Sequence, residues 1–155
     1  MNKSKEILQN EIRYAIRLTE RTARLYRLVQ TVGVFFSILG GSAAMASLSG
    51  NLPSWLLATG GALLAISGAT LIAIRPADKA AQNENDVRRY RALMAKSHEM
   101  NVDQLAATLD EAHQTDVPEI ESLREVAYND VALESNRPDV LVPLSASQKI
   151  LSALA

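Results

Sequence analysis

An uncharged stretch of 47 consecutive residues, 28–74, constrains the fold of this chain more than any other feature. It contains no Asp, Glu, Lys, Arg or His, although the rest of the chain is densely charged. A helix needs about 20 apolar residues to cross roughly 30 Å of bilayer hydrocarbon. Residues 28–48 and 55–74 each meet that requirement, and residues 49–54 between them contain the turn formers Gly, Asn and Pro. The stretch therefore predicts a transmembrane hairpin of two helices and a tight turn.

The alternative to a membrane hairpin is a pair of buried helices in a soluble bundle. Helices in such bundles normally keep one polar face, and neither apolar segment has a charged face. A cleaved signal peptide would begin with a short basic region followed at once by an apolar run. Here 27 residues of charged, helix-forming sequence come first. The pattern favours two membrane spans, with the first acting as an uncleaved insertion signal.

Basic residues flank the apolar stretch on both sides and predict its orientation. Residues 1–27 carry a net charge of +4, whereas residues 75–155 carry −5 with several basic residues directly after the second span. Positive residues near span ends stay on the cytoplasmic side. We therefore expect a bacterial inner-membrane protein with both termini in the cytosol. The basic residues expected to set this topology and to face lipid are Arg13, Arg17, Arg21, Arg24, Arg27, Arg75 and Lys79.

Small residues form rows along both predicted spans, where they let helix backbones approach closely. Two interpretations stay open. Either the rows seal the hairpin within one chain, or one row seals the hairpin and another joins neighbouring chains into a homo-oligomer. The residues expected to carry helix packing or oligomerisation are Gly33, Ser37, Gly41, Gly61, Ala65, Ala69 and Ala73, with Gly40 and Ala44 as a further small pair.

Hydroxyl side chains lie within both predicted spans, whereas ionisable side chains do not. Intramembrane ionisable residues usually mark ion pathways or proton relays, so their absence argues against a transporter or pump. A pore wetted by Ser and Thr stays open, although such side chains often bond back to their own helix backbone. The candidates are Thr31, Ser37, Ser42 and Ser47 in the first span and Thr59, Ser67 and Thr70 in the second.

The segment 4–27 predicts an amphipathic helix, with five arginines on one side and apolar residues on much of the other. We expect its apolar face to pack on the C-terminal region, the alternative being attachment to anionic lipid. Nucleic-acid binding is not expected, because the segment matches no known nucleic-acid-binding motif.

The predicted fold is an all-α membrane protein with an N-terminal amphipathic helix (1–27), a transmembrane hairpin (28–74) and a cytosolic helical tail (75–155). The tail has too few apolar residues for a large core, so it is expected to need the N-terminal helix or a neighbouring subunit for burial. Apolar spacing and start signals at Asn101, Pro118 and Ser145 predict tail helices near residues 77–99, 102–114, 118–135 and 146–154.

No catalytic, cofactor or metal site is predicted. The chain has no cysteine, and its two histidines, His98 and His113, lie 15 residues apart on different predicted helices. A triplet of His113 with Asp110 and Glu111 is interpreted as a solvated helix face rather than a zinc site.

The segment SLREVAYNDVALE, residues 122–134, is the most distinctive part of the tail. Its Tyr128, Asn129 and Asp130 place polar groups beside an apolar helix face. This favours a helix-packing seam with a buried tyrosine hydroxyl. The alternative is a contact with a partner or ligand.

The layout resembles the SLATT domains, two-transmembrane effector modules of bacterial defence systems. The likeness is carried by the arginine-striped segment 13–27, the hairpin around Asn51-Leu52-Pro53, and the segments VRRYRALMAKSHEM (87–100) and EIESLREVAYNDVALE (119–134). The resemblance implies a membrane pore that depolarises the cell when a linked sensor responds. Because no sensor domain is fused to the spans in this sequence, it implies a separate cytosolic sensor protein or a response by the tail itself.

The predicted function is that of an oligomeric two-span inner-membrane protein that permeabilises the membrane and is gated by its cytosolic helices. The alternative is a non-conducting membrane anchor or an interaction or sensor protein, including a prophage-exclusion or holin-like protein. The expected partners are the lipid bilayer, further copies of the chain and a separate sensor protein. An enzyme is not expected.

Overall fold

The computed structural model describes residues 4–48, 50 and 53–155. All regular secondary structure in this part of the chain is helical, with no strand, which confirms the predicted all-α class. Backbone contacts divide the chain into two compact units. We call Met1–Leu25 together with Lys79–Ala155 the discontinuous unit, and Tyr26–Asp78 the hairpin unit.

The longest helix, α1, runs without interruption from Lys5 to Leu48. It includes both the predicted amphipathic helix and the predicted first span. No glycine or proline occurs in α1 before Gly33, so the sequence has no signal that would end the helix at residue 27. The first part of α1 belongs to the discontinuous unit and the remainder to the hairpin unit.

The second apolar helix, α2, extends from Ser54 to Ile74 and matches the predicted second span. Pro53 precedes it with φ −59° and ψ 143°. Arg75 ends it in the left-handed conformation, with φ 49°, and donates its N–H to the carbonyl oxygen of Leu71 at 3.1 Å. Of the predicted turn, residues 49, 51 and 52 lie outside the described residues, and Gly50 has φ 77°.

Among the described residues, two helices are long and apolar enough to cross a membrane. Their most apolar 18-residue stretches have mean hydropathies of 1.6 and 1.9, and only 6% of each stretch is buried inside the protein. Large side chains such as Phe35, Ile38, Ile66 and Ile72 are exposed. Core helices of soluble proteins are mostly buried, so the apolar stretches of α1 and α2 do not have the burial of a soluble core.

The tail is helical, as predicted. Its α4 begins at a capping box between Asn101 and Gln104, and its α6 begins at a capping box between Ser145 and Gln148, which confirms both predicted helix starts. The tail elements are α3 (Pro76–Lys96), α4 (Val102–Gln114), the 3₁₀ turn η1 (Glu121–Leu123), α5 (Arg124–Glu134), the 3₁₀ turn η2 (Pro138–Val140) and α6 (Ala146–Leu154).

The helix predicted over residues 118–135 begins later than expected, and Pro118 does not occupy a first helical position. Residues 116–120 are irregular instead. Val117 precedes a proline, which disfavours the helical conformation for it, and its N–H donates to Asp86 Oδ2 at 3.2 Å. This bond to α3 holds the segment extended, so regular helix starts only at η1 and α5.

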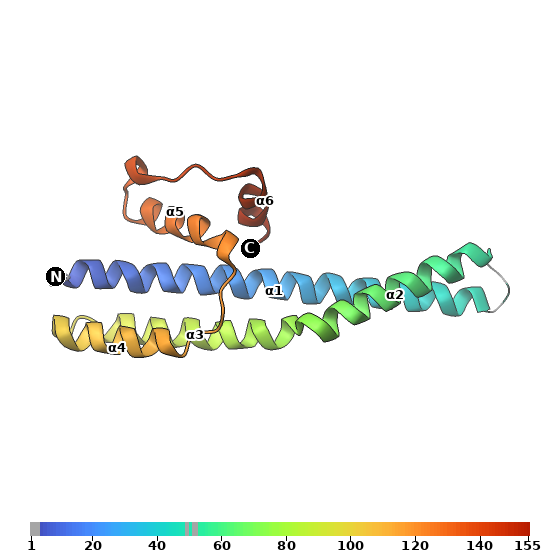
Figure 1. Ribbon diagram of the computed structural model, residues 1–155, viewed down its shortest axis with the longest axis horizontal. Helices are drawn as coiled ribbons and strands as arrows, with labels where there is room; N and C mark the ends of the chain where they lie inside the picture. Colours follow the sequence, from blue (N-terminus) through green and yellow to red (C-terminus); the bar gives the residue numbers. More distant parts are fainter. Residues whose placement is uncertain (1–3, 49, 51–52) are drawn as a thin grey trace. The chain divides into compact units, whose positions relative to one another are not determined.

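The discontinuous unit has its core on both sides of the first part of α1. Figure 1 shows α3 and α4 on one side of this part of α1, with α5 and α6 on the other. Leu18 of α1 packs with Leu123 and Ala127 on the α5 side. The N-terminal helix therefore supplies the burial that the tail lacks. On the α3–α4 side the core consists of Leu8, Ile12, Ala15, Tyr90, Leu93, Leu105, Leu109 and Ala112.

Candidate functional site

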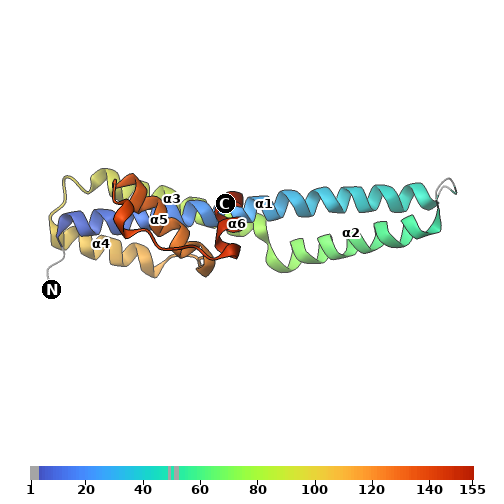
Figure 2. The ribbon, with the colours of Figure 1, turned by 90° about the horizontal axis from the view of Figure 1, so that it is seen from above.

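A seam of glycines brings α1 and α2 together within the hairpin unit, where Figure 2 shows the two helices side by side. A Cβ atom added to Gly40 would lie 2.5 Å from the carbonyl oxygen of Gly60 and 2.8 Å from the backbone nitrogen of Leu64. A Cβ added to Gly60 would lie 2.8 Å from the carbonyl oxygen of Gly40. All three contacts are with backbone atoms, which cannot move aside as a side chain can. A Cβ added to Gly33 would meet the side chain of Leu71 in the same seam.

Ala44 also borders this seam, since its backbone nitrogen would lie 3.0 Å from a Cβ added to Gly60, whereas Gly41 and Gly61 lie outside it. A Cβ added to Gly41 would have only Leu64 Cδ2 nearby, at 3.9 Å, and one added to Gly61 would meet nothing within 4 Å. The hairpin therefore closes on one row of glycines and leaves a second row open. The open row consists of Gly61 and the exposed Ala65, Ala69 and Ala73.

Gly60 was missed by the sequence analysis. Gly33 and Gly40 are seven residues apart, and so are Gly60 and Ser67, which is buried. A seven-residue spacing returns to the same side of a helix after two turns. This spacing, together with the predicted small pair of Gly40 and Ala44, is the signal for the seam.

The hydroxyl side chains of the hairpin unit divide into exposed and covered ones. Thr59 and Thr70 donate to the carbonyl oxygens of Trp55 and Ile66, at 3.1 and 2.8 Å. Ser47 bonds back to Ala43 in the same way, as expected for hydroxyls in membrane helices. Thr31 and Ser42 are exposed, Ser67 is buried, and the buried Oγ of Ser37 has no partner within the described residues.

Two arginines of the N-terminal stripe bind α5 in the discontinuous unit. Arg21 contacts both carboxylate oxygens of Asp130, with Nη2 2.9 Å from Oδ1. Arg17 forms an ion pair with Glu134. Both the arginines and the carboxylates are four residues apart, so the pairing makes α1 and α5 antiparallel. This matched spacing was available in the sequence but was not used to pair the two segments.

The other predicted basic residues have different surroundings. Arg13 donates to Asn10 Oδ1 at 3.4 Å. Arg24, Arg27 and Arg75 are exposed, whereas Lys79 is partly buried. The structure thus places Arg17 and Arg21 against α5 and leaves other members of the predicted set at the surface.

A buried tyrosine ties α3 to the end of α4. The hydroxyl of Tyr90 donates to Asp116 Oδ2 and lies 2.8 Å from Nδ1 of His113. Arg89 binds Asp86 and the same Asp116. Burial, together with the Asp116 carboxylate, raises the pKa of Tyr90, so the phenol stays a neutral donor. This polar role of Tyr90 was not predicted from the sequence.

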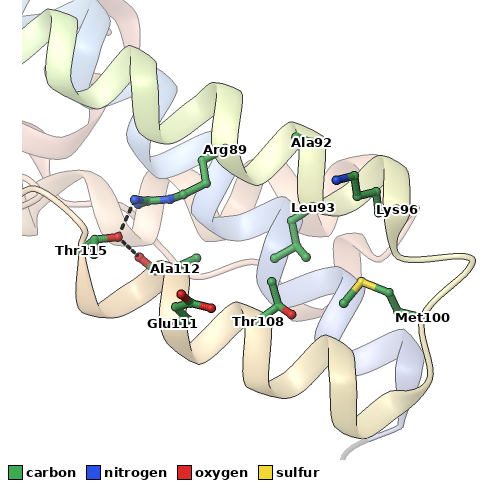
Figure 3. Close-up of a pocket in the computed structure, with 9 residues that line it drawn as sticks. All are labelled: Arg89, Ala92, Leu93, Lys96, Met100, Thr108, Glu111, Ala112 and Thr115. Carbon is green, nitrogen blue, oxygen red and sulfur yellow. Dashed lines mark hydrogen bonds between the residues drawn. The ribbon is translucent and has the colours of Figure 1, made fainter.

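A pocket of about 440 Å³ lies between α3 and α4 (Figure 3). Leu93, Ala112 and Met100 supply apolar lining, and Arg89 donates to Thr115 at one end. The Arg89 guanidinium is already neutralised by its two carboxylate partners. The pocket therefore has the chemistry of an apolar cleft rather than of an anion site.

The predicted polar group of α5 does not form one site. Tyr128 is 43% exposed, so the expected buried hydroxyl is wrong. Asn129 exchanges two 2.8 Å hydrogen bonds with the backbone of Val142, and Asp130 binds Arg21. Asn129 and Asp130 thus bind within the chain, while Tyr128 stays at the surface.

Neither histidine belongs to a metal cluster in the part of the chain that the structure describes. Nδ1 of His113 lies 3.0 Å from Asp116 Oδ2, so its carboxylate neighbour is not Asp110 or Glu111, as the triplet would require. No groups of three or more His, Cys, Asp or Glu residues suited to a metal ion occur among these residues.

Because of the surroundings of Glu119, in the irregular segment before η1, we expect the stability of the protein to depend on pH. Burial raises the pKa of Glu119 above its usual 4.5, against an opposing effect of Arg124. The folded state therefore binds this proton more tightly than the unfolded state, and stability falls as the pH rises through the interval between the two pKa values. Glu119→Gln, which mimics the protonated side chain, is expected to raise the melting temperature at pH 7 by about 2–4 °C.

The gain is expected to vanish below pH 4.5, where the unfolded carboxyl is also protonated. Thermal unfolding of the full chain in neutral detergent across this pH range measures it. Glu121→Gln is the matched control, because Glu121 is mostly exposed. Equal melting temperatures for the Glu119 variant and the parent at pH 7 would contradict the prediction.

Comparison with known proteins does not assign the chain to a family. No family model, no curated protein and no solved structure matches it. The resemblance to SLATT domains therefore stays a prediction, and the function is argued from the structure.

Proposed function

We propose that this chain is a two-span protein of the bacterial inner membrane that assembles with further copies and permeabilises the membrane, gated by its cytosolic helices. The observation that carries the proposal is the exposed apolar surface of the hairpin unit, of which only a narrow seam is covered. Soluble monomers rarely expose apolar patches of that extent. A lipid bilayer can surround such helices, because their backbone N–H and C=O groups are hydrogen-bonded within each helix.

The open row of small residues supports assembly into an oligomer. Gly33, Gly40 and Gly60 already close the hairpin, so the row from Gly61 to Ala73 is not needed for that purpose. In lipid, helices associate mainly through close packing at small residues. A neighbouring copy is the partner that this row suits best.

The positions of the hydroxyls support a pore within such an assembly. Thr59 and Thr70 are eleven residues apart, which is three turns or about 16 Å along one face of α2. The exposed Thr31 and Ser42 have the same spacing on α1. Their oxygens can accept hydrogen bonds from water, whereas the spans offer no ionisable group for coupled transport.

The exposed basic residues support an orientation with both termini in the cytosol. Arg24 and Arg27 precede the first span, and Arg75 follows the second. Basic residues next to span ends favour the cytoplasmic side. The discontinuous unit would then face the cytosol, where a separate sensor protein could reach it.

The test is the membrane potential, followed with a voltage-sensitive dye in bacteria that produce the full chain from a titratable promoter. The parent chain is expected to depolarise the cells, and Ala65→Leu, in the open row, is expected to abolish this. Ala65→Ser is the matched control at equal membrane level, because serine keeps a small side chain at the same exposed position. An undiminished effect of Ala65→Leu would contradict the assembly surface.

A non-conducting anchor is the second candidate, favoured by the exposed Tyr128 and Leu133 on α5. Exposed aromatic and aliphatic side chains of this kind suit a protein contact. An anchor predicts a stable potential at every expression level. That outcome would reject the pore.

A further inference from the structure

An arginine-lined groove lies along the first part of α1, within the discontinuous unit. It consists of two adjoining cavities of about 300 and 340 Å³, which share Arg17, Glu20 and Glu134 in their lining. We call it the arginine groove. Its charged lining comprises Arg13, Arg17, Arg21, Arg24 and Arg91 with the carboxylates Glu20, Asp130 and Glu134.

The arginine groove carries an excess of positive charge. Five arginines face three carboxylates, which leaves +2 in a chain whose net charge is −1. Glu20 is shared between Arg17 and Arg91, and Asp130 is taken by Arg21. The excess of positive charge therefore lies toward Arg13, whose guanidinium donates to the neutral amide oxygen of Asn10, and toward the exposed Arg24.

We propose that the arginine groove binds a small phosphate-bearing anion with at least two negative charges. The planar guanidinium fork matches phosphate oxygens in pairs. An excess of two positive charges is neutralised by a multiply charged anion and not by a single one. The volume of the two cavities suits a small molecule. A soluble phosphate compound and a lipid headgroup share this chemistry, and the experiment below separates them.

The ligand competes with a carboxylate of the protein itself. The Arg17–Glu134 pair is partly exposed, with 38% and 40% of the two side chains accessible. Exposed pairs of this kind contribute little to stability, so an incoming phosphate can replace Glu134 at Arg17. Binding would then remove one of the two ion pairs through which the arginine stripe holds α5.

The test is isothermal titration of the purified full chain, in a neutral detergent at low salt, with inorganic pyrophosphate. Arg24→Gln is expected to weaken binding about tenfold, because it removes one forked donor and leaves the two pairs to α5 in place. Arg137→Gln is the matched control with the same charge change, since Arg137 is exposed and pairs with Asp139 on η2. Its affinity is expected to stay within about twofold of the parent.

A second variant separates a binding role from a structural one. Glu134→Gln removes the competing carboxylate and is expected to tighten pyrophosphate binding several-fold. Glu121→Gln makes the same charge change outside the groove and is expected to have little effect. A purely structural role for Glu134 would give no gain in affinity.

The source of the phosphate is decided by a parallel titration with cardiolipin in mixed micelles, because its headgroup carries two phosphates and therefore two negative charges. Saturable pyrophosphate binding with the expected variant pattern assigns a soluble ligand. Binding of the lipid alone, with the same dependence on Arg24 and Glu134, assigns a headgroup. No saturable binding of either below about 1 mM, or equal affinities for all variants, overturns the proposal. The titration requires no conductance, so its failure is distinct from a failure of the proposed pore.

Discussion

Replacing Gly40 by alanine is expected to destabilise the hairpin unit, even though alanine is the better helix former. The added Cβ would lie 2.5 Å from the carbonyl oxygen of Gly60 and 2.8 Å from the backbone nitrogen of Leu64. The two helices must move apart to admit it, at a cost of about 1–3 kcal/mol or more. The gain from helix propensity, about 1 kcal/mol, does not offset the larger part of that range.

Gly41→Ala is the matched control for this prediction. The two positions are adjacent on α1, and the Cβ at Gly41 would meet only a side-chain methyl at 3.9 Å. For Gly41→Ala, the gain in helix propensity is expected to leave the stability of the hairpin unit unchanged or slightly higher. Thermal unfolding in neutral detergent should show Gly40→Ala melting several degrees below Gly41→Ala. The fluorescence of Trp55, the single tryptophan and the second residue of α2, reports on the hairpin directly. Identical transitions for the two variants would show that the seam does not hold the hairpin.

Ile12→Ala is expected to weaken the discontinuous unit more than any exposed substitution on the same helix. Ile12 is 0% exposed and belongs to the core cluster formed with α3 and α4. Removing a buried isoleucine side chain typically costs about 2–5 kcal/mol, through lost burial and the cavity left behind. A substantial part of the stability of a unit of this size would be lost.

Ile7→Ala makes the same chemical change at a site that is 49% exposed. Its effect is expected to stay within about 0.5 kcal/mol. Amide hydrogen exchange across α3 and α4 distinguishes the two variants, because loss of the α1 contact should raise exchange in both helices only for Ile12→Ala. Equal exchange would mean that the tail helices do not depend on α1 for burial.

Features that depend on neighbouring residues were predicted well from the sequence. The starts of α4 and α6 follow from Asn101 and Ser145, whose caps act within one helical turn. The limits of α2 follow from the uncharged stretch and from Pro53 before it. In each case a few adjacent residues supply both the signal and the physical cause.

Features that depend on distant residues were predicted poorly. The late start of α5 follows from the bond between Val117 and Asp86, 31 positions apart in the chain. The exposure of Tyr128 follows from which face of α5 meets α1, and Ala127, one residue earlier, is the one that enters the core. The pairing of Arg21 with Asp130 joins positions 109 apart. Periodicity marks a face of a helix but not the element that will cover it.

For the charged residues too, the local pattern was predicted from the sequence, whereas the contacts between distant residues were not. The arginine stripe was recognised, and its expected packing on the tail agrees with the contacts of α1 in both core clusters. What the pattern did not distinguish is the role of each arginine. Arg21 binds α5, whereas Arg24, three residues later, is exposed. That difference depends on Asp130 and Glu134, which lie in another part of the chain.

The discontinuous unit combines both ends of the chain, and this sets the order in which it can form on the ribosome. Ile12 is made about 80 residues before its partner Tyr90, an interval of roughly 4–16 s at ordinary rates of bacterial synthesis. The whole hairpin is translated within that interval. The apolar side of the first part of α1 therefore stays uncovered until α3 and α4 are made, although it is synthesised before them.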